Sequence, residues 1–234
     1  MTLVGTAATV VLLRDGAEGL EVLLLERPRH TGTFAGAWVF PGGRVDPEDY
    51  EAAGLPRPEE SAENRHLEAD LAAARIAGVR ETAEETALEL APGSLVDLSC
   101  WVPPLQAPKR LRTWFFLAAY PGGEVRLNPG ELIDYAWLAP VDALQLHRGG
   151  KMLLVAPTFV TLTLLQQFQD VAAAVEHAAG AAPETFSSRL LDGYEPDAVI
   201  AWHGDEQYPA EGAGQPGDRH RLVMRGSDWR YERT

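Results

Sequence analysis

A single long helix, predicted from about residue 62 to residue 90, constrains the fold of this chain more than any other feature. Its apolar side chains gather on one side of a helical wheel, which predicts a buried face of Ile76, Val79, Ala83, Ala87 and Leu90. Pro92 and Gly93 are expected to end the helix soon afterwards. Because a helix with one apolar face needs another element to cover it, we expect this helix to pack against a sheet.

Acidic side chains line the opposite side of the same predicted helix. Glu81, Glu84 and Glu85 are spaced at i, i+3 and i+4, so their carboxylates lie one above the other, and Glu89 extends the stripe. Each like-charged pair costs an isolated helix about 0.2–0.5 kcal/mol. Acids near the C-terminus of a helix also oppose its dipole. The stripe is therefore either a solvated helix face or a site where a divalent cation compensates the repulsion.

Strand-like segments stand on both sides of this helix in the sequence. Residues 4–13 and 20–27 are β-rich runs joined by the turn-like RDGAEG, which indicates a hairpin. The pattern then predicts three more strands and two more helices, at 95–102, 111–120, 134–138, 140–150 and 156–180. This order predicts an α+β fold, with a mixed β-sheet sandwiched between helices and a β-rich extension at residues 183–234.

Composition narrows the function. The 234 residues fit a single domain spanning 1–234, and the acidic, proline-containing segment 44–66 is expected to be an insertion at its surface. With 34 acids, 20 bases and a formal net charge of −14, the chain is not expected to bind nucleic acid. Cys100 is the only cysteine, which excludes an internal disulfide and a thiolate zinc cluster. No stretch has the apolar length of a membrane span, so a cytoplasmic location is expected.

A glycine loop precedes the acidic helix and completes a pattern with it. In FPGGRVD, residues 40–46, Gly42 and Gly43 let the backbone approach a partner closely where a side chain would collide. Carboxylate oxygens on a rigid helix suit Mg²⁺ or Mn²⁺. Because Mg²⁺ in proteins is usually shared between carboxylates, waters and substrate phosphates, the pattern predicts a diphosphate-bearing ligand.

The two segments together resemble the signature of the Nudix hydrolases, G-x5-E-x7-R-E-U-x-E-E-x-G-U, in which U is a bulky aliphatic residue. Gly43 matches the first glycine, and Arg80-Glu81 and Glu84-Glu85 match the R-E and E-E pairs. Gly43 and Arg80 are 37 positions apart (80 − 43) instead of 14, so about 23 residues are inserted. Three further departures follow from counting around Arg80: Ala72 replaces the earlier glutamate, Thr82 the first aliphatic residue and Ala87 the second glycine.

The resemblance implies a role for each matching residue. Glu81, Glu84 and Glu85 would hold Mg²⁺ or Mn²⁺ and take part in hydrolysis, while Arg80 would be structural and orient a glutamate or the glycine loop. Glu131, before a predicted strand, would be a further ligand or base, with Asp134 as the alternative. The sequence leaves open which of Glu81, Glu84 and Glu131 is the general base. The family also includes many homodimers.

A narrower resemblance concerns the substrate. Segment 20–49 is similar to the Nudix branch that includes acyl-CoA diphosphatases, in which an Arg-x-x-His-x-Gly run before FPGG is tied to CoA recognition. The substrate-binding residues implied here are Arg27, Arg29, His30, Gly42, Gly43 and Lys109, with Gly32 in the same run. CoA or acyl-CoA is thus the leading substrate, and ADP-ribose, another nucleotide sugar or NADH are alternatives. A non-catalytic Nudix-like module that senses a nucleotide is the alternative from another class.

Overall fold

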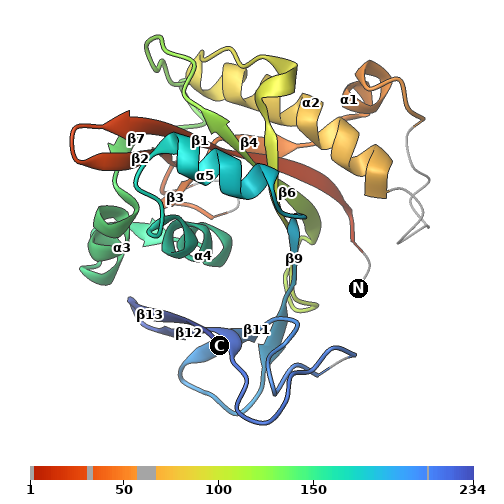
Figure 1. The fold of residues 1–234 in the computed structure, drawn as a ribbon, viewed down its shortest axis with the longest axis vertical. Helices are drawn as coiled ribbons and strands as arrows, with labels where there is room; N and C mark the ends of the chain where they lie inside the picture. The colour runs from red at the N-terminus through yellow and green to blue at the C-terminus, as the bar shows by residue number, and fades with distance from the viewer. Residues whose placement is uncertain (1–2, 31–33, 57–66, 210) are drawn as a thin grey trace.

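The computed structural model describes residues 3–30, 34–56, 67–209 and 211–234. Among them, the main sheet has nine strands in the order β8-β3-β2-β1-β6-β5-β9, with β4 paired to β1 and β7 paired to β2 (Figure 1). Their bounds are β1 Gly5–Gly16, β2 Gly19–Glu26, β3 Ala37–Val39, β4 Gly42–Arg44, β5 Val96–Val102, β6 Leu111–Ala119, β7 Asp134–Leu138, β8 Leu153–Leu154 and β9 Glu184–Ser187. The β1–β2 hairpin and the strands expected near 95–102, 111–120 and 134–138 are confirmed.

The glycine loop lies where β1 and β2 diverge. These strands pair only near their hairpin turn, from Leu13↔Val22 to Gly16↔Gly19. Beyond that point β3 pairs with the end of β2, and β4 pairs with the first half of β1. Val10 N–H donates to the Pro41 carbonyl at 2.8 Å, which secures the link between β3 and β4. The sheet therefore holds Gly42 and Gly43 at a fixed place on its surface.

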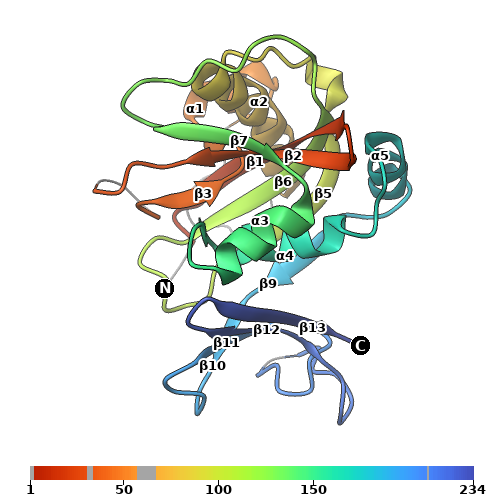
Figure 2. The same ribbon diagram turned by 90° about the vertical axis from the view of Figure 1, so that its left-hand side faces the viewer.

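Helices cover both faces of the sheet (Figure 2). The helices α1 (Pro47–Ala52) and α2 (Leu67–Thr86) pack over one apolar core. The helices α3 (Pro140–Arg148), α4 (Ala156–Leu165) and α5 (Val171–Ala179) pack over a second core on the other face. A short 3-10 turn (Pro92–Ser94) precedes β5. The α+β architecture predicted from the sequence is confirmed.

The buried face of α2 differs from the predicted one. The residues that α2 buries are Asp70, Ala73, Ala74, Ala77, Gly78, Thr82, Glu85 and Thr86. Ile76, Val79 and Ala83 are only half-buried, and Ala87 is exposed. Small side chains let α2 lie close to the sheet, since a Cβ at Gly78 would come within 3.0 Å of a Val10 methyl group. The prediction assigned the large apolar side chains to the buried face. Close packing of α2 against the sheet instead requires small side chains at the contact.

The end of α2 also differs, because the helix stops at Thr86 instead of continuing to residue 90. Ala87 has φ of 58°, a left-handed conformation that ends a helix and favours glycine. Leu90 is buried beyond the helix, and Glu89 does not extend the acidic stripe. The predicted start at residues 62–66 lies outside the described residues.

The second predicted helix, at 156–180, is two helices. α4 ends at Leu165 and α5 begins at Val171, because the Asp170 side chain caps α5 by accepting a hydrogen bond from Ala173 N–H at 2.8 Å. Asp170 therefore marks the start of a new helix, which the continuous apolar pattern of residues 156–180 did not indicate. Within the described part of the chain, no helix has the length and apolar character needed to cross a membrane.

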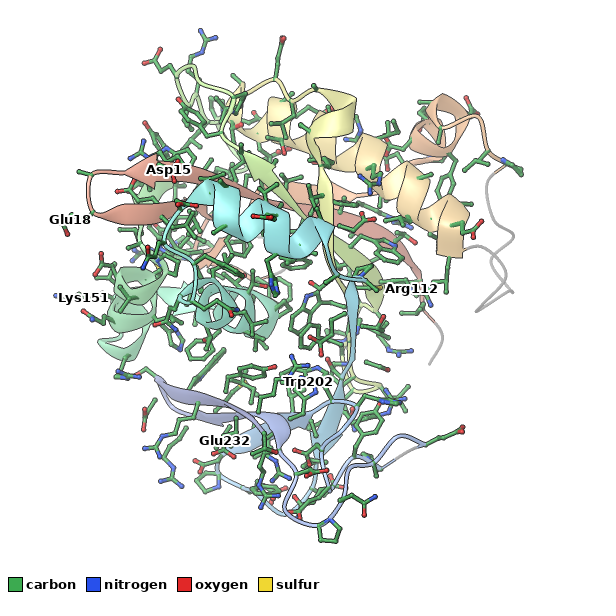
Figure 3. The ribbon with its side chains drawn as sticks, in the orientation of Figure 1. Asp15, Glu18, Arg112, Lys151, Trp202 and Glu232 are labelled. Carbon is green, nitrogen blue, oxygen red and sulfur yellow. The ribbon has the colours of Figure 1, made fainter. Side chains whose placement is uncertain are left out.

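The C-terminal extension is attached to the main body. Its strand β9 joins the main sheet beside β5, and four more strands form a second, antiparallel sheet: β10 Arg189–Leu191, β11 Ala198–Ala201, β12 His220–Arg225 and β13 Asp228–Arg233. Trp202, labelled in Figure 3, lies between the second sheet and the main body. Its ring packs edge-on against Trp101 of β5, which itself stacks on Phe186 at a centroid distance of 4.0 Å.

Candidate active site

The glycine loop and the end of α2 meet at Glu85. Gly42 N–H donates to Glu85 Oε2 at 2.8 Å, and Glu85 is buried, with 6% of its surface exposed. Gly42 has φ of 153°, and a Cβ at this position would collide with the Ala8 carbonyl. Only glycine can bring the β4 backbone this close to both β1 and the carboxylate.

The next glycine makes room for a second acid. A Cβ at Gly43 would collide with the carboxylate of Glu81, one turn before Glu85 on α2. The structure thus brings Gly42, Gly43, Glu81 and Glu85 together, as the sequence pattern anticipated.

Arg80 connects α1, the glycine loop and α2. Its guanidinium donates to both oxygens of Asp49 at 3.1 and 2.9 Å and to the Arg44 carbonyl at 3.1 Å. It also donates to Glu81 at 3.0 Å and to Glu84 at 3.2 Å. The hydrogen bonds that Arg80 donates to Asp49, together with the nearby charge of Glu81, raise the pKa of Arg80 above its usual value, although burial opposes the shift. Arg80 therefore offsets part of the repulsion for which the sequence suggested a cation.

Asp49 is a site residue that sequence reasoning missed. Counting backward from Arg80 placed the first acid of the motif on Ala72, but counting forward from Gly43 places it on Asp49 (49 − 43 = 6). Asp49 is 2% exposed and also accepts a hydrogen bond from Asp46 N–H at 2.8 Å. The forward G-x5-D spacing was the available signal. The additional residues therefore lie between Asp49 and Arg80.

The expected surface insertion at 44–66 is in part a structural element. Its residues 47–52 form α1, and Tyr50 is buried and donates its hydroxyl to Asp70 of α2 at 2.7 Å. This contact fixes α1 against α2 and so places Asp49 beside Arg80. Residues 57–66 of the segment lie outside the described residues.

The electrostatics of the site centre on Glu85. Burial, together with the negative charges of Glu81 and Glu131, raises the pKa of Glu85 to about 7, although Gly42 N–H and the positive charge of Arg27 oppose the shift. Burial likewise raises the pKa of Glu81 above its ordinary value, and Arg80 opposes it. Glu85 is thus a buried acid whose charge is incompletely compensated.

Glu131 and Glu84 occupy the rim of the site. Glu131 is exposed in the loop before β7, and the nearby Asn128 N–H donates to the Glu85 carbonyl at 3.2 Å. The alternative, Asp134, is the first residue of β7 and stands opposite Glu26 in the pairing of β7 with β2. Glu84 faces solvent, with 52% of its side chain exposed, and pairs with Arg80. Glu81 is the less exposed of the two glutamates that Arg80 contacts on α2.

Among the basic residues implied in CoA recognition, Arg27 interacts with the acids of the site. It is half-buried, and its charge acts on Glu85. Arg29 is exposed and donates to Glu26 Oε1 at 3.1 Å, and His30 is exposed. Gly32 lies outside the described residues.

Lys109 lies outside the strands beside the glycine loop. Gly42 pairs with Thr9, and Thr9 pairs with Phe115 in the middle of β6, whereas Lys109 precedes the first residue of that strand, Leu111. Lys109 itself is exposed, and its basic neighbours make contacts within the protein. Arg110 is buried and donates to the Pro103 carbonyl, and Arg112 pairs with Asp70 at 3.5 Å.

The donor chemistry of this site fits a hard divalent cation. Glu81, Glu84, Glu85 and Glu131 supply carboxylate oxygens, and Gly43 leaves open space for the Glu81 carboxylate. Across the described residues, no three or more His, Cys, Asp or Glu side chains are already gathered as a metal cluster. Arg80 holds Glu81 and Glu84 in this structure, so a cation would compete with Arg80 for them.

Comparisons with known proteins agree with the fold and the motif. No known protein-family profile matches the sequence. The protein called nudix hydrolase 7 from Caenorhabditis elegans is 23% identical over 183 residues, which cover 70% of this chain and 61% of that protein, less than two thirds of its length. A crystal structure of a NUDIX hydrolase from Alicyclobacillus acidocaldarius is 29% identical, covers 75% of this chain and 97% of its own, and superimposes with a TM-score of 0.65. The chain therefore has the Nudix fold, and its sequence is similar to those of Nudix hydrolases.

Proposed function

We propose that this protein is a metal-dependent hydrolase that cleaves the diphosphate linkage of a nucleoside diphosphate joined to a second group. The observation that carries the proposal is the contact between Gly42 N–H and Glu85, a buried acid with a pKa of about 7 beside Glu81, Glu131 and Arg27. Perturbed acids of this kind concentrate at active sites. The likeness to Nudix hydrolases supports the same activity.

Each residue has a proposed role in this reaction. Glu81, Glu84 and Glu85 would hold Mg²⁺ or Mn²⁺, which, when bound, neutralises charge on the diphosphate and lowers the pKa of a water molecule. One of the four carboxylates Glu81, Glu84, Glu85 and Glu131 accepts the proton of the attacking water. Arg27 contacts a phosphate oxygen, and Arg80, held by Asp49, keeps Glu81 and Glu84 at the site.

CoA or acyl-CoA is the proposed substrate, with 3′,5′-ADP and a phosphopantetheine product. The support is the sequence resemblance around Arg27, together with the position of Arg27 close to Glu85. ADP-ribose, another nucleotide sugar and NADH are the competing substrates.

An assay of product release from CoA, ADP-ribose and NADH, with Mg²⁺ and with Mn²⁺, tests the proposal. Glu85→Gln should lower turnover about 100-fold or more, the usual range for a lost general base. Glu89→Gln is the matched control, because Glu89 is exposed and lies beyond the end of α2. Equal turnover in the two variants would contradict the role of Glu85.

A nucleotide-sensing module is the second candidate, and one observation favours it. Arg80 already holds Glu81 and Glu84, so a nucleotide could bind at Arg27 and the glycine loop without a cation. A sensor would show ligand-induced shifts in melting temperature with CoA or ADP-ribose, and no turnover with either metal.

A further inference from the structure

An exposed apolar surface borders the candidate active site at the start of β7. Ile133 is 51% exposed and Tyr135 is 39% exposed, two and four residues after Glu131. Large apolar side chains that remain in water next to a functional site commonly mark where a ligand binds.

The strand pairing fixes the side of the sheet on which Tyr135 lies. Leu23 and Leu25 of β2 belong to the core under α2, and they pair with Trp137 and Tyr135. Paired residues of neighbouring strands share one face of the sheet, so Tyr135 lies on the face that α2 covers. Arg27, two residues after Leu25, lies on the same face.

Ile133 also lies beside the end of β2. It stands in a bend just before β7, and its N–H donates to the Glu26 carbonyl at 3.0 Å, so it adjoins the residue that precedes Arg27. The charge of Arg27 acts on Glu85. The carboxylate of Glu85, the guanidinium of Arg27 and an exposed apolar surface therefore lie in one region of the protein. This arrangement suits a ligand that has a charged part beside a flat apolar part.

We propose that Tyr135 is a specificity-determining residue that stacks on the base of the nucleotide half of the substrate, with Ile133 at the edge of the same subsite. Tyr135 pairs with Leu25, so Arg27 is its diagonal neighbour on the paired strand, roughly 7–8 Å away, a distance that one ribose can bridge. A tyrosine ring on a flat sheet surface offers a π-face that any nucleobase can stack on. This inference rests on the proposed function, because it takes the phosphates to lie beside Arg27 and the acids.

Titration calorimetry with AMP and with ribose 5-phosphate, in the presence of Mg²⁺, tests the stacking directly. Tyr135→Ala should weaken AMP binding by about 5- to 150-fold, the range that base stacking on an aromatic ring supplies, and should leave ribose 5-phosphate unchanged. Tyr135→Phe keeps the ring and should retain AMP affinity. Leu105→Ala is the matched control, because Leu105 is 52% exposed in the loop between β5 and β6.

Three results would overturn the inference: equal weakening of both ligands by Tyr135→Ala, no weakening of either, or wild-type protein that binds AMP no more tightly than ribose 5-phosphate. Selective weakening of acyl-phosphopantetheine by Tyr135→Ala, with AMP unaffected, would assign the surface to an apolar chain and overturn it as well. Failure of the proposed function is seen separately, since wild-type protein would then bind AMP through Tyr135 yet hydrolyse none of the diphosphates.

Discussion

Two buried carboxylates, Glu85 in the candidate active site and Asp205 in the second sheet, are held in opposite ways. Burial and acidic neighbours raise the pKa of Glu85 to about 7. Burial also acts to raise the pKa of Asp205, but donors from Arg221, His220 and Gln207 outweigh it, so the net pKa is lowered. A fully paired buried charge destabilises the fold when a partner is removed, whereas an incompletely compensated one is free to bind a cation or a proton.

The largest expected effect comes from breaking the paired acid. Arg221→Ala leaves Asp205 buried without its main partner, which should lower the free energy of unfolding by about 3–5 kcal/mol. Urea denaturation measures it. Arg230→Ala is the control, because the Arg230–Asp228 pair is exposed and should contribute less than about 1 kcal/mol. Similar losses in both variants would show that the Asp205 network does not anchor the second sheet.

Removing the incompletely compensated charge of Glu85 should have the opposite effect and raise the free energy of unfolding. The folded pKa of Glu85 is about 7 against an ordinary value of 4.5, so metal-free protein loses stability as pH rises from 4.5 through 7. Glu85→Gln should therefore be more stable than wild type at pH 8, by at most about 3 kcal/mol. The difference should vanish below pH 4.5. Thermal melts in chelator at both pH values measure it, and a lower melting temperature for the variant at pH 8 would refute the repulsion.

Asp205 should give the reverse dependence on pH. Because its folded pKa is lowered from 3.8, the stability it contributes is present above that value and is lost as pH falls below it. The stability difference between wild type and Asp205→Asn should therefore narrow on acidification from pH 6 to pH 3. Urea denaturation across that range tests it, and a constant difference would mean that the charge of Asp205 is not what the network holds.

The smallest effect concerns the end of α2, which positions Glu85. Ala87 adopts φ of 58°, so Ala87→Gly should raise the free energy of unfolding by about 1 kcal/mol through relief of left-handed strain. Ala83→Gly, inside the same helix, should lower it by about 1 kcal/mol. Opposite signs in thermal melts are expected. A loss of stability in both variants would show that the Ala87 conformation carries no strain.

The strands and the meeting of the glycine loop with the acidic helix could be predicted, because alternation, turn residues and motif spacing are local. The face of α2 could not, since close packing against Val10 selects Ala77 and Gly78 over bulkier neighbours. Asp49 was missed because the motif was counted from Arg80 across a long added segment. The sequence alone did not indicate Tyr135 as a ligand-binding residue, because its place on the sheet depends on its pairing with Leu25, a contact between distant parts of the chain.

Calorimetric titration of Mn²⁺ into metal-free protein, with AMP present, tests most directly whether the acids on α2 form a cation site. Wild type and Glu89→Gln should bind Mn²⁺ alike, and Glu85→Gln should bind it markedly more weakly, because one carboxylate ligand is lost. An absence of Mn²⁺ binding in wild type, or equal binding in all three proteins, would contradict the site.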